Sequence, residues 1–357
     1  MELLSVTMND GVKPRSEIEG KDNSSEDKSN YKIVRKGDMV YNSMRMWQGA
    51  NGISPCDGIV SPAYTVLMPK QEINNGYFAA LFKSVTLINE FRKNSQGMTS
   101  DTWNLKYPQI ETIKVQIPSV SEQDKVSELF SVLDERIATQ AQLVESLKKY
   151  KRGVVRTLLS PNHCKLKNVE WTTAKIGDIG TFIKGAPLSK ADISSDGTPF
   201  ILYGELYTTY NEVISKVVRK TQASVDKQYY SRIGDVIIPT SGETPEEIST
   251  ASCVMLPDII LAGDLNIYRC TQVDGRIMSY ILNHVVNDRI ARVAQGKSIV
   301  HVQATEISKI EITYPDLISQ KKLIETFDAI TARIEQSMRE LELMQVHRKA
   351  LLQQLFI

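Results

Sequence analysis

The chain has 357 residues, and its 43 Lys and Arg nearly balance its 42 Asp and Glu, giving a formal net charge of +1 at pH 7. This balance indicates that the protein as a whole has no positive field to attract a nucleic acid. A nucleic acid that meets a local basic face remains compatible with it. The four cysteines form no CxxC pair, which argues against a structural zinc site or a disulfide framework. No stretch approaches the ~18 apolar residues of a membrane span, so we expect a soluble, cytoplasmic protein of about two domains.

Short runs of β-type residues come first in the chain and return after its middle. Strands are predicted at 38–41, 63–67, 199–203 and 235–238, where apolar residues are bounded by Gly, Asn, Asp and Pro. We therefore expect two mixed α/β domains with many turns, one ahead of each of two long helical segments.

A heptad pattern follows the first of these regions. Its seam alternates spacings of three and four residues, which is typical of a helix that packs along another helix. A helix of ~37 residues is about 55 Å long at 1.5 Å per residue. Pro118 and Ser121 mark its start, as Pro315 marks the start of a second helix. The seam consists of Val126, Phe130, Leu133, Ile137, Gln140, Val144, Leu147, Lys151, Val154 and Leu158.

Residues 118–160 recur without a gap as residues 315–357, which stand 197 positions later. Pro118, Gln123, Phe130, Arg136 and Ile137 recur as Pro315, Gln320, Phe327, Arg333 and Ile334. The second seam consists of Leu323, Phe327, Ile330, Ile334, Ser337, Leu341, Met344, Arg348, Leu351 and Leu355. Polar residues interrupt both seams at matching places, and such residues can fix register and partner. We expect an intramolecular antiparallel coiled coil; the alternative is two amphipathic helices buried in separate domains.

The offset of 197 continues into the regions ahead of the helices. At this offset Gly37 aligns with Gly234, and Leu3 aligns with Phe200. The residues between such matching positions differ, as expected when two related scaffolds present different surfaces. One asymmetry stands out, because the segment from Trp171 to Gly197 has no counterpart ahead of Met1. We expect the first domain to lack about its first 37 residues, through truncation or rearrangement, or to receive those elements from elsewhere.

The chain carries none of the sequence signatures of the common catalytic classes. It contains no GxxxxGK[ST], GxGxxG, HExxH or GxSxG motif and no Pro-Pro-Tyr motif of the amino-methyltransferases. The four histidines, His163, His284, His301 and His347, are isolated from one another in the sequence. We therefore expect a protein that is not an enzyme and that holds no metal.

Two polar loops are the best candidates for binding. Each follows a Gly-Asp strand start, at 41–53 in the first domain and at 239–244 in the second, and concentrates amides, hydroxyls, Arg and Gly. Such side chains discriminate base edges, while glycines let backbone N–H groups approach phosphates; an ordinary polar turn is the alternative. Further polar segments recur at 96–104 and 295–303. The candidate contact residues are Asn42, Ser43, Arg45, Trp47, Gln48, Thr240, Ser241, Glu243 and Thr244, with Lys184, Tyr203, Lys297 and His301 in equivalent loops.

The combination of motifs, helices and duplication resembles the specificity subunits of Type I restriction-modification systems. The resemblance is carried by the strings that begin at Lys36 (KGDMVYNSMR), Gly58 (GIVSPAY), Ile117 (IPSVSEQDKV), Leu133 (LDERI) and Leu147 (LKKYKRG). Members normally open with a Trp-x-x-x-x-Ile/Leu-Gly-Asp pattern like that at 171–178, which the first domain lacks.

This resemblance implies a division into a shortened target recognition domain (1–117), a first spacer helix (118–160), a second target recognition domain (161–314) and a second spacer helix (315–357). It also implies that the two domains read the halves of a bipartite site in double-stranded DNA. The antiparallel helices would set their separation and dock two methyltransferase subunits, with restriction subunits in the restricting form. S-adenosylmethionine is expected on the methyltransferase subunit and no cofactor on this chain; a coiled-coil scaffold joining two protein-binding domains is the alternative.

Overall fold

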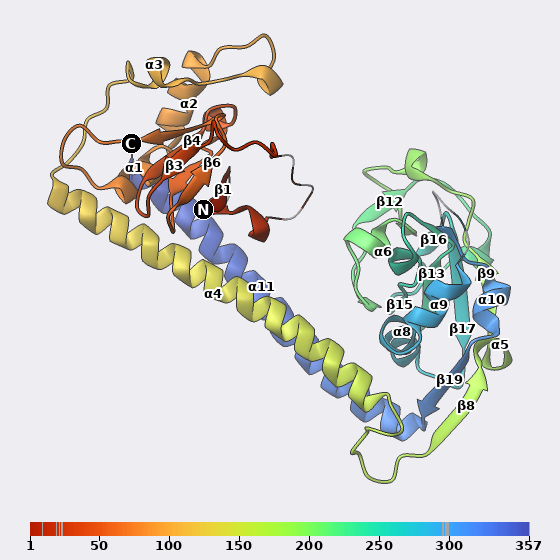
Figure 1. Cartoon of the computed structure of the whole chain (residues 1–357). Helices are drawn as coiled ribbons and strands as arrows, with labels where there is room; N and C mark the ends of the chain where they lie inside the picture. The colour runs from red at the N-terminus through yellow and green to blue at the C-terminus, as the bar shows by residue number, and fades with distance from the viewer. Residues whose placement is uncertain are drawn as a thin grey trace. The chain divides into compact units, whose positions relative to one another are not determined.

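The computed structural model describes residues 1–8, 10–18, 20, 22, 24–294, 296 and 300–356. The chain forms two compact units (Figure 1). Unit 1 comprises Met1–Leu143 with Ser337–Ile357, and unit 2 comprises Val144–Gln336. Each unit therefore contains one α/β region and parts of both long helices, α4 (Val120–Leu158) and α11 (Leu317–Leu355).

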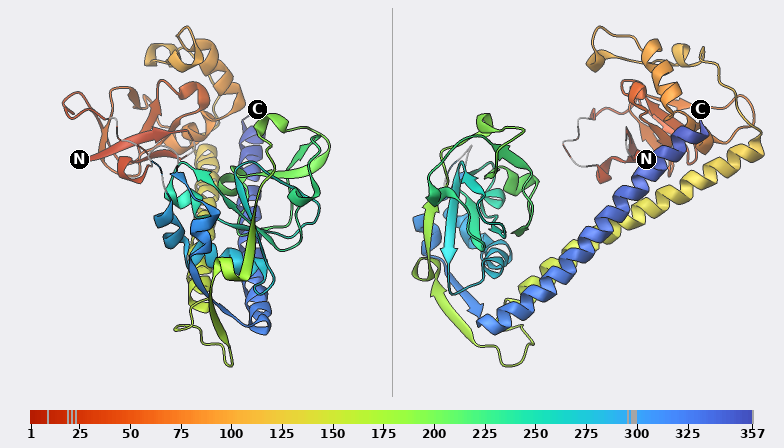
Figure 2. Two further views of the ribbon diagram at one scale, coloured as in Figure 1. Left: turned by 90° about the vertical axis from the view of Figure 1, so that its right-hand side faces the viewer. Right: turned by 180° about the vertical axis from the view of Figure 1, so that it is seen from behind.

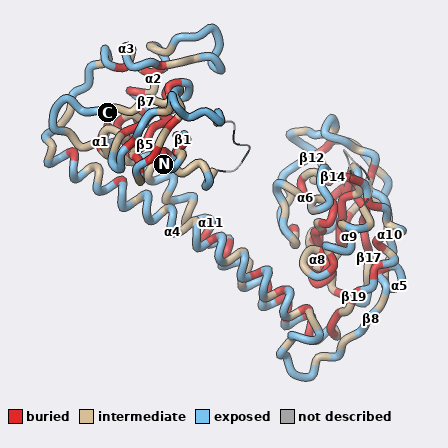
Figure 3. Tube along the Cα trace, viewed as in Figure 1, coloured by how far each residue is buried: buried red, intermediate tan, exposed pale blue. Residues whose placement is uncertain are grey.

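Unit 1 is built on two small sheets, with strand orders β2-β1-β6-β3 and β5-β4-β7. Its strands are β1 (Glu2–Thr7), β2 (Gly11–Pro14), β3 (Lys32–Val34), β4 (Met39–Asn42), β5 (Asn51–Ile53), β6 (Gly58–Val60) and β7 (Tyr64–Leu67). Its shorter helices are α1 (Asn75–Leu81), α2 (Val85–Asn94) and α3 (Tyr107–Ile110), with 3-10 turns η1 (Arg15–Glu17), η2 (Met46–Gln48) and η3 (Ser100–Thr102). One core cluster of this unit lies between β4, α1, α2 and the long helices, and a second lies among β1, β2, β3, β4 and β6; buried residues are red in Figure 3.

Unit 2 has sheets of orders β12-β10-β16 and β11-β15-β13-β17-β9 and the two-stranded pairs β19-β8 and β14-β18. Its strands are β8 (Trp171–Lys175), β9 (Gly180–Lys184), β10 (Thr198–Leu202), β11 (Val213–Ile214), β12 (Arg219–Thr221), β13 (Asp235–Pro239), β14 (Ser241–Gly242), β15 (Ser252–Val254), β16 (Ile260–Ala262), β17 (Leu265–Cys270), β18 (Val300–His301) and β19 (Glu311–Pro315). Its helices are α5 (Ile176–Ile179), α6 (Glu205–Thr208), α7 (Pro245–Ile248), α8 (Gly275–His284), α9 (Asn287–Val293) and α10 (Ala304–Ser308), with η4 (Lys190–Asp192) and η5 (Lys227–Tyr229).

The strand pairing confirms the repeated frame that the sequence predicts. The parallel pair β1–β6 sets Leu3 opposite Ile59, and the parallel pair β10–β16 sets Phe200 opposite Ile260. Strands β4 and β13 are each the centre of an antiparallel group, flanked by β5 and β7 in unit 1 and by β15 and β17 in unit 2. In unit 2 the segment that begins at Trp171 adds β8 along β19 and β9 along β17.

A glutamine kept in both copies links each α/β region to its long helices. In unit 1 the Gln123 side chain accepts a hydrogen bond from the Asn74 backbone N–H (3.0 Å) and donates to the Pro118 carbonyl (2.9 Å). In unit 2 Gln320 bonds in the same way to the Asp274 N–H (2.7 Å) and the Pro315 carbonyl. Both glutamines are buried, so losing either bond would leave polar groups unsatisfied. This explains why proline and glutamine recur together.

The two long helices have the length and position that the repeat predicts. Each has 39 residues, and the start and end of α11 stand 197 positions after those of α4. The capping residue differs from the predicted Ser121: Ser119 bonds to Glu122 through its N–H and hydroxyl, and Asp316 caps α11 by accepting from Ser319. Both caps directly follow a proline, and Ser119 stands two residues before the predicted Ser121.

Within unit 1 the helices pair antiparallel, and Figure 2 shows α4 and α11 side by side in both views. Gln140 donates to the Ser337 carbonyl (3.0 Å), so the two polar seam residues that match in the repeat also meet in space. Further along, Arg348 forms an ion pair with Asp134 (2.9 Å from Nη2 to Oδ2), and Phe356 stacks on Phe130. Except for the exposed Leu355, the predicted seam positions are buried or partly buried.

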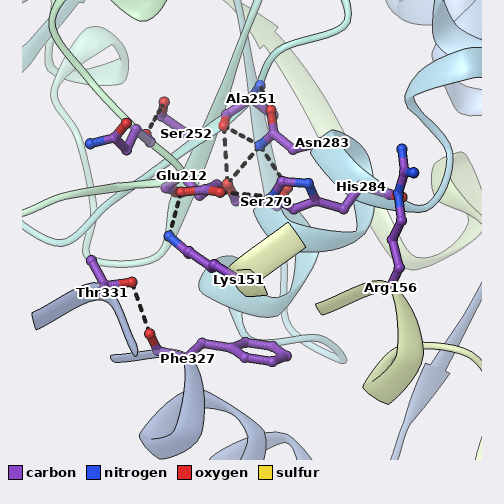
Figure 4. A network of polar contacts seen from close by, with 11 residues as sticks. Lys151, Arg156, Glu212, Ala251, Ser252, Ser279, Asn283, His284, Phe327 and Thr331 are labelled. Carbon is purple, nitrogen blue, oxygen red and sulfur yellow. Dashed lines mark hydrogen bonds and ion pairs between the residues drawn. The ribbon is translucent and has the colours of Figure 1, made fainter. Parts of the chain in front are cut away.

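In unit 2 the other polar seam residue of α4 serves a different purpose. The Lys151 Nζ lies 2.8 Å from Glu212 Oε2, and His284 Nε2 lies 2.7 Å from Glu212 Oε1 (Figure 4). All three side chains are largely buried. Ser279 donates its hydroxyl to the Glu212 carbonyl (2.7 Å), and Lys151 also lies over the Tyr280 ring. A buried ion pair of this kind fixes α4 to one place on the α/β region.

The described residues include no helix long and apolar enough to cross a membrane. They also include no group of three or more His, Cys, Asp or Glu side chains that could hold a metal ion. The four cysteines are all free thiols, and Cys253 is the buried one.

Replacing Phe327 by Ala should lower the free energy of unfolding by about 3–5 kcal/mol, the usual cost of emptying a fully buried aromatic site. Phe327 is 0 % exposed and its ring meets that of Tyr280 at 4.8 Å. Urea denaturation followed by circular dichroism measures the change, and Leu343→Ala, at a 57 % exposed position of the same helix, is the control. Equal losses of unfolding free energy in the two variants would contradict the burial of Phe327 on the helix seam.

Glu212 should make stability depend on pH below about 4.5. Burial alone raises the pKa of Glu212, but the hydrogen bond from His284 and the charge of Lys151 outweigh it and lower the pKa to about 2. A depressed carboxyl pKa contributes stability above the unfolded value of 4.5 that is lost as pH falls towards about 2, here about 3 kcal/mol. As pH falls over that range, the unfolding free energy of Glu212→Gln should decrease less steeply than that of the exposed control Glu325→Gln. Parallel curves of unfolding free energy against pH would show that Glu212 is not the group responsible.

Candidate nucleic-acid interface

In unit 1 the predicted loop leaves β4 as a tight turn that its own side chains hold. The Asn42 carboxamide accepts from the Met44 N–H (3.1 Å), and the Ser43 hydroxyl donates to the Ala63 carbonyl (2.6 Å). The turn closes through Gly49, whose φ of 84° lies in the left-handed region that glycine adopts without strain. Asn42 and Ser43 therefore shape the loop, and Ser43 is buried.

Two tryptophans and an arginine form a cluster beside this turn. The Trp47 ring meets the Trp103 ring edge-on at 5.1 Å, and the Arg92 guanidinium lies 5.7 Å from the Trp47 ring centroid. The indole N–H of Trp47 donates to the Met44 carbonyl (3.2 Å). Trp103 belongs to the second polar segment, so the structure brings the two predicted segments of this domain together.

Arg45 and Gln48 complete the predicted set in unit 1. Arg45 is exposed, and within the described residues its guanidinium makes no hydrogen bond or ion pair. Gln48 is partly buried at the end of η2. A free guanidinium on a rigid turn can offer its paired N–H groups to a guanine edge or to a phosphate.

The loops of the two units share one backbone contact. In unit 1 the Leu105 N–H donates to the Ser43 carbonyl (2.8 Å), and in unit 2 the Val302 N–H donates to the Thr240 carbonyl (3.1 Å). The two donor residues stand 197 positions apart, and so do the two acceptor residues. The two predicted loops are therefore equivalent in structure as well as in sequence, although their side chains differ.

In unit 2, side chains and strands from several parts of the chain bond to the predicted loop at 239–244. Ser241 pairs with His301 across β14–β18, and the Ser241 hydroxyl donates to Asp264 (3.1 Å). Tyr207 donates its hydroxyl to the Ser241 carbonyl (2.6 Å), and burial raises the pKa of this tyrosine, which keeps the donor proton in place. The Tyr203 ring meets the Tyr207 ring edge-on at 6.3 Å.

Three of the predicted residues of unit 2 face one cavity of about 640 Å³. Lys184, Thr240 and His301 line it together with Asp264 and other residues. Lys184 and His301 are exposed, so their charged and aromatic ends can reach a ligand. Lys297 lies outside the described residues.

Glu243 and Thr244 have structural roles at the start of α7. The Thr244 hydroxyl accepts from the Glu247 N–H (3.2 Å) and caps the helix, while the Glu243 N–H donates to the Glu247 carboxylate (2.8 Å). Both side chains remain exposed.

Sequence reasoning did not select Arg92, Trp103, Tyr207, Asp264 or Gln303, which the structure places around the two loops. Trp103 lies in a segment that had been singled out as polar and glycine-rich, and its bulk was a usable signal. Gln303 likewise lies in the predicted polar segment 295–303, whereas Arg92, Tyr207 and Asp264 carry no local pattern, because strands or helices distant in sequence bring them to the loops.

The chain belongs to the family of the Type I restriction modification DNA specificity domain, whose members it matches over residues 5–149 and again over 168–344. Each match takes in one α/β region and part of a long helix. Specificity subunits recognise DNA and are not the catalytic components of these systems, which agrees with the prediction that the chain is not an enzyme.

The chain is similar to two specificity subunits of Methanocaldococcus jannaschii. It is 21 % identical to the Type I restriction enzyme MjaVIII specificity subunit over 347 residues, covering 90 % of this chain and 78 % of that protein. It is 22 % identical to the putative Type I restriction enzyme MjaX specificity subunit over 294 residues, 77 % of this chain and 65 % of that protein.

Two solved structures share the fold. The S subunit of a Type I restriction-modification system from M. genitalium matches with a TM-score of 0.56 and 16 % identity over 91 % of this chain and 84 % of that one. A chain from a structure on complex assembly and conformational transition of the type I R-M system matches with a TM-score of 0.61 and 15 % identity, over 93 % and 84 %. At these identities the likeness concerns the fold alone.

Thr244→Ala should lower the stability of unit 2 by about 1 kcal/mol, because the α7 cap is lost, whereas Thr244→Ser should keep it. Urea denaturation of both variants measures the difference. If Thr244→Ala left stability unchanged and weakened DNA binding, Thr244 would be a contact residue and the capping role would be wrong.

Proposed function

We propose that this chain recognises a bipartite site in double-stranded DNA with two target recognition domains, one in each unit. The observation that carries the proposal is the shared contact between Ser43 and Leu105 and between Thr240 and Val302. It holds two equivalent polar loops on one backbone frame and equips them with different side chains. Two domains that share a backbone arrangement and carry different side chains on its surface are suited to reading two different half-sites.

The exposed groups on these loops are of the types that read DNA. Arg45 and Lys184 supply positive charge, and His301 and Gln303 supply groups that can donate and accept at base edges. Trp47, held by Trp103 and Arg92, gives unit 1 a rigid apolar surface next to Arg45. Side chains fixed by their neighbours lose little entropy on binding.

The helices are suited to be the spacer between the half-sites. A helix of 39 residues is about 58 Å long, which corresponds to ~17 base pairs at ~3.4 Å per step. We expect two methyltransferase subunits to dock on the helices, with S-adenosylmethionine bound to those subunits and not to this chain. Restriction subunits would join in the restricting form of the complex.

Selection from random duplexes by the complex of this chain with its methyltransferase partner tests the proposal. Sequencing of the retained DNA should give two short specific half-sites separated by a spacer of fixed length. A retained pool without any common motif would overturn the proposal, and one continuous motif would argue against two readers.

Arg45→Ala should relax selectivity at one half-site only, by about 1–3 kcal/mol if Arg45 makes a paired contact with guanine. Arg45→Lys is the matched control, because it keeps the charge and loses the forked donor geometry. Methylation rates on duplexes with single base changes measure both variants. If the methylation rates of both variants were unchanged at every base position, Arg45 would not be a DNA-contact residue.

A further inference from the structure

Unit 1 contains a cavity of about 600 Å³ between the α1 region and the two long helices. The corresponding cavity of unit 2, between the α8 region and the same helices, measures about 320 Å³. The equivalence is fixed by the glutamines described above, which contact Asn74 at the start of α1 and Asp274 at the start of α8. The two cavities can therefore be compared residue by residue.

Small residues enlarge the cavity of unit 1. Gly76 and Ala80 line it from α1, at the positions where α8 carries Arg276 and Tyr280. On the helix side, Ser131 stands where unit 2 has Asp328, 197 positions later. Ala80 and Ser131 are smaller than Tyr280 and Asp328, whereas Gly76 approaches Ser127 so closely that a Cβ there would lie 2.2 Å from its Oγ.

The cavity of unit 2 is partly occupied by its own carboxylate. Glu212, the residue directly before β11, extends between Lys151 Nζ (2.8 Å) and His284 Nε2 (2.7 Å), as Figure 4 shows. Because an ionised carboxylate only accepts hydrogen bonds, both nitrogens donate to it. This arrangement shows what kind of group the site in unit 2 binds.

Two cations, Lys83 and Arg348, line the cavity of unit 1 together with the carboxylates of Asp10 and Asp134. Arg348 replaces Lys151 at the equivalent position of the repeat, and Lys83 lies two residues after the end of α1, one position from the residue that aligns with His284 at the end of α8. Asp10, directly before β2, occupies the place of Glu212 in the chain order, but it pairs with Lys13 (3.5 Å) and is exposed. Arg348 pairs with Asp134, and the Lys83 ammonium has no hydrogen bond or ion pair with any described residue, its backbone N–H alone bonding to the Ala80 carbonyl.

The surroundings of Lys83 disfavour its charge. Burial lowers the pKa of Lys83, and the nearby Arg348 lowers it further, while Asp134 and Asp10 act in the opposite direction. A carboxylate bound beside Lys83 would give this ammonium the direct partner that Asp134 and Asp10 do not provide.

We propose that the unit 1 cavity is a binding site for a carboxylate group, held between Lys83 and Arg348 as Glu212 is held in unit 2. The carboxylate is supplied either by a free small acid or by an acidic side chain of a partner polypeptide. This site is separate from the loops assigned to DNA, and it stands whether or not the proposed function is correct.

Calorimetric titration of the full chain with three probes tests the site: acetate, succinate, and a peptide with one glutamate and blocked ends. Saturable binding of at least one probe is expected. Binding of the free acids indicates a small acid as the ligand, and binding of the peptide alone indicates a partner's side chain. No saturable binding of any probe would overturn the proposal.

Three variants locate the binding. Lys83→Met should weaken it about tenfold or more, since a charge-assisted bond is lost, while Lys70→Met at an exposed loop position should leave it unchanged. Asp10→Glu should abolish it, because the longer side chain can reach Lys83 as Glu212 reaches His284. Ala80→Tyr should abolish it by filling the cavity as Tyr280 does. Binding that survives both Lys83→Met and Asp10→Glu would refute the site, even if Ala80→Tyr failed to fold.

Discussion

The pairing of two copies of one 39-residue helix is the constraint on which the rest of the structure depends. An isolated amphipathic helix of this length leaves its apolar seam in water, and burying that seam against an antiparallel partner removes this cost. The contact between Gln140 and Ser337 fixes the register within unit 1. Once the register is set, Gln123 and Gln320 connect each α/β region to the pair through the same hydrogen bonds.

Equivalent positions of the repeat have taken different roles on this common frame. Lys151 reaches from α4 to Glu212 in the α/β region of unit 2, whereas Arg348 stays within the helix pair and bonds to Asp134. The polar loops follow the same principle, since the backbone contact made by Ser43 and Thr240 is kept while the exposed side chains differ. Duplication thus preserves the packing that supports both units and leaves the surfaces free to diverge.

The sequence alone predicts the fold well because periodicity and repetition are local properties. The seam positions and the strand that begins at Asp235 follow from spacing alone. The first cap was misplaced at Ser121 because Ser119 also fits the local pattern, and only the Glu122 contact distinguishes them. Tyr207 and Asp264 could not be found, because their roles depend on which distant strands and helices meet. Whether Thr244 caps or contacts is likewise decided by tertiary geometry.

Lengthening the helix pair tests the central account most directly. Because Gln140 and Ser337 meet, duplicating residues 134–140 and 331–337 adds one heptad to each helix at facing positions and preserves the seam. Seven residues add about 10 Å, or about three base pairs. The methylated motif of a host carrying this variant should keep both half-sites and gain a spacer longer by about three base pairs. An unchanged spacer in an active complex, or altered half-sites, would contradict the account.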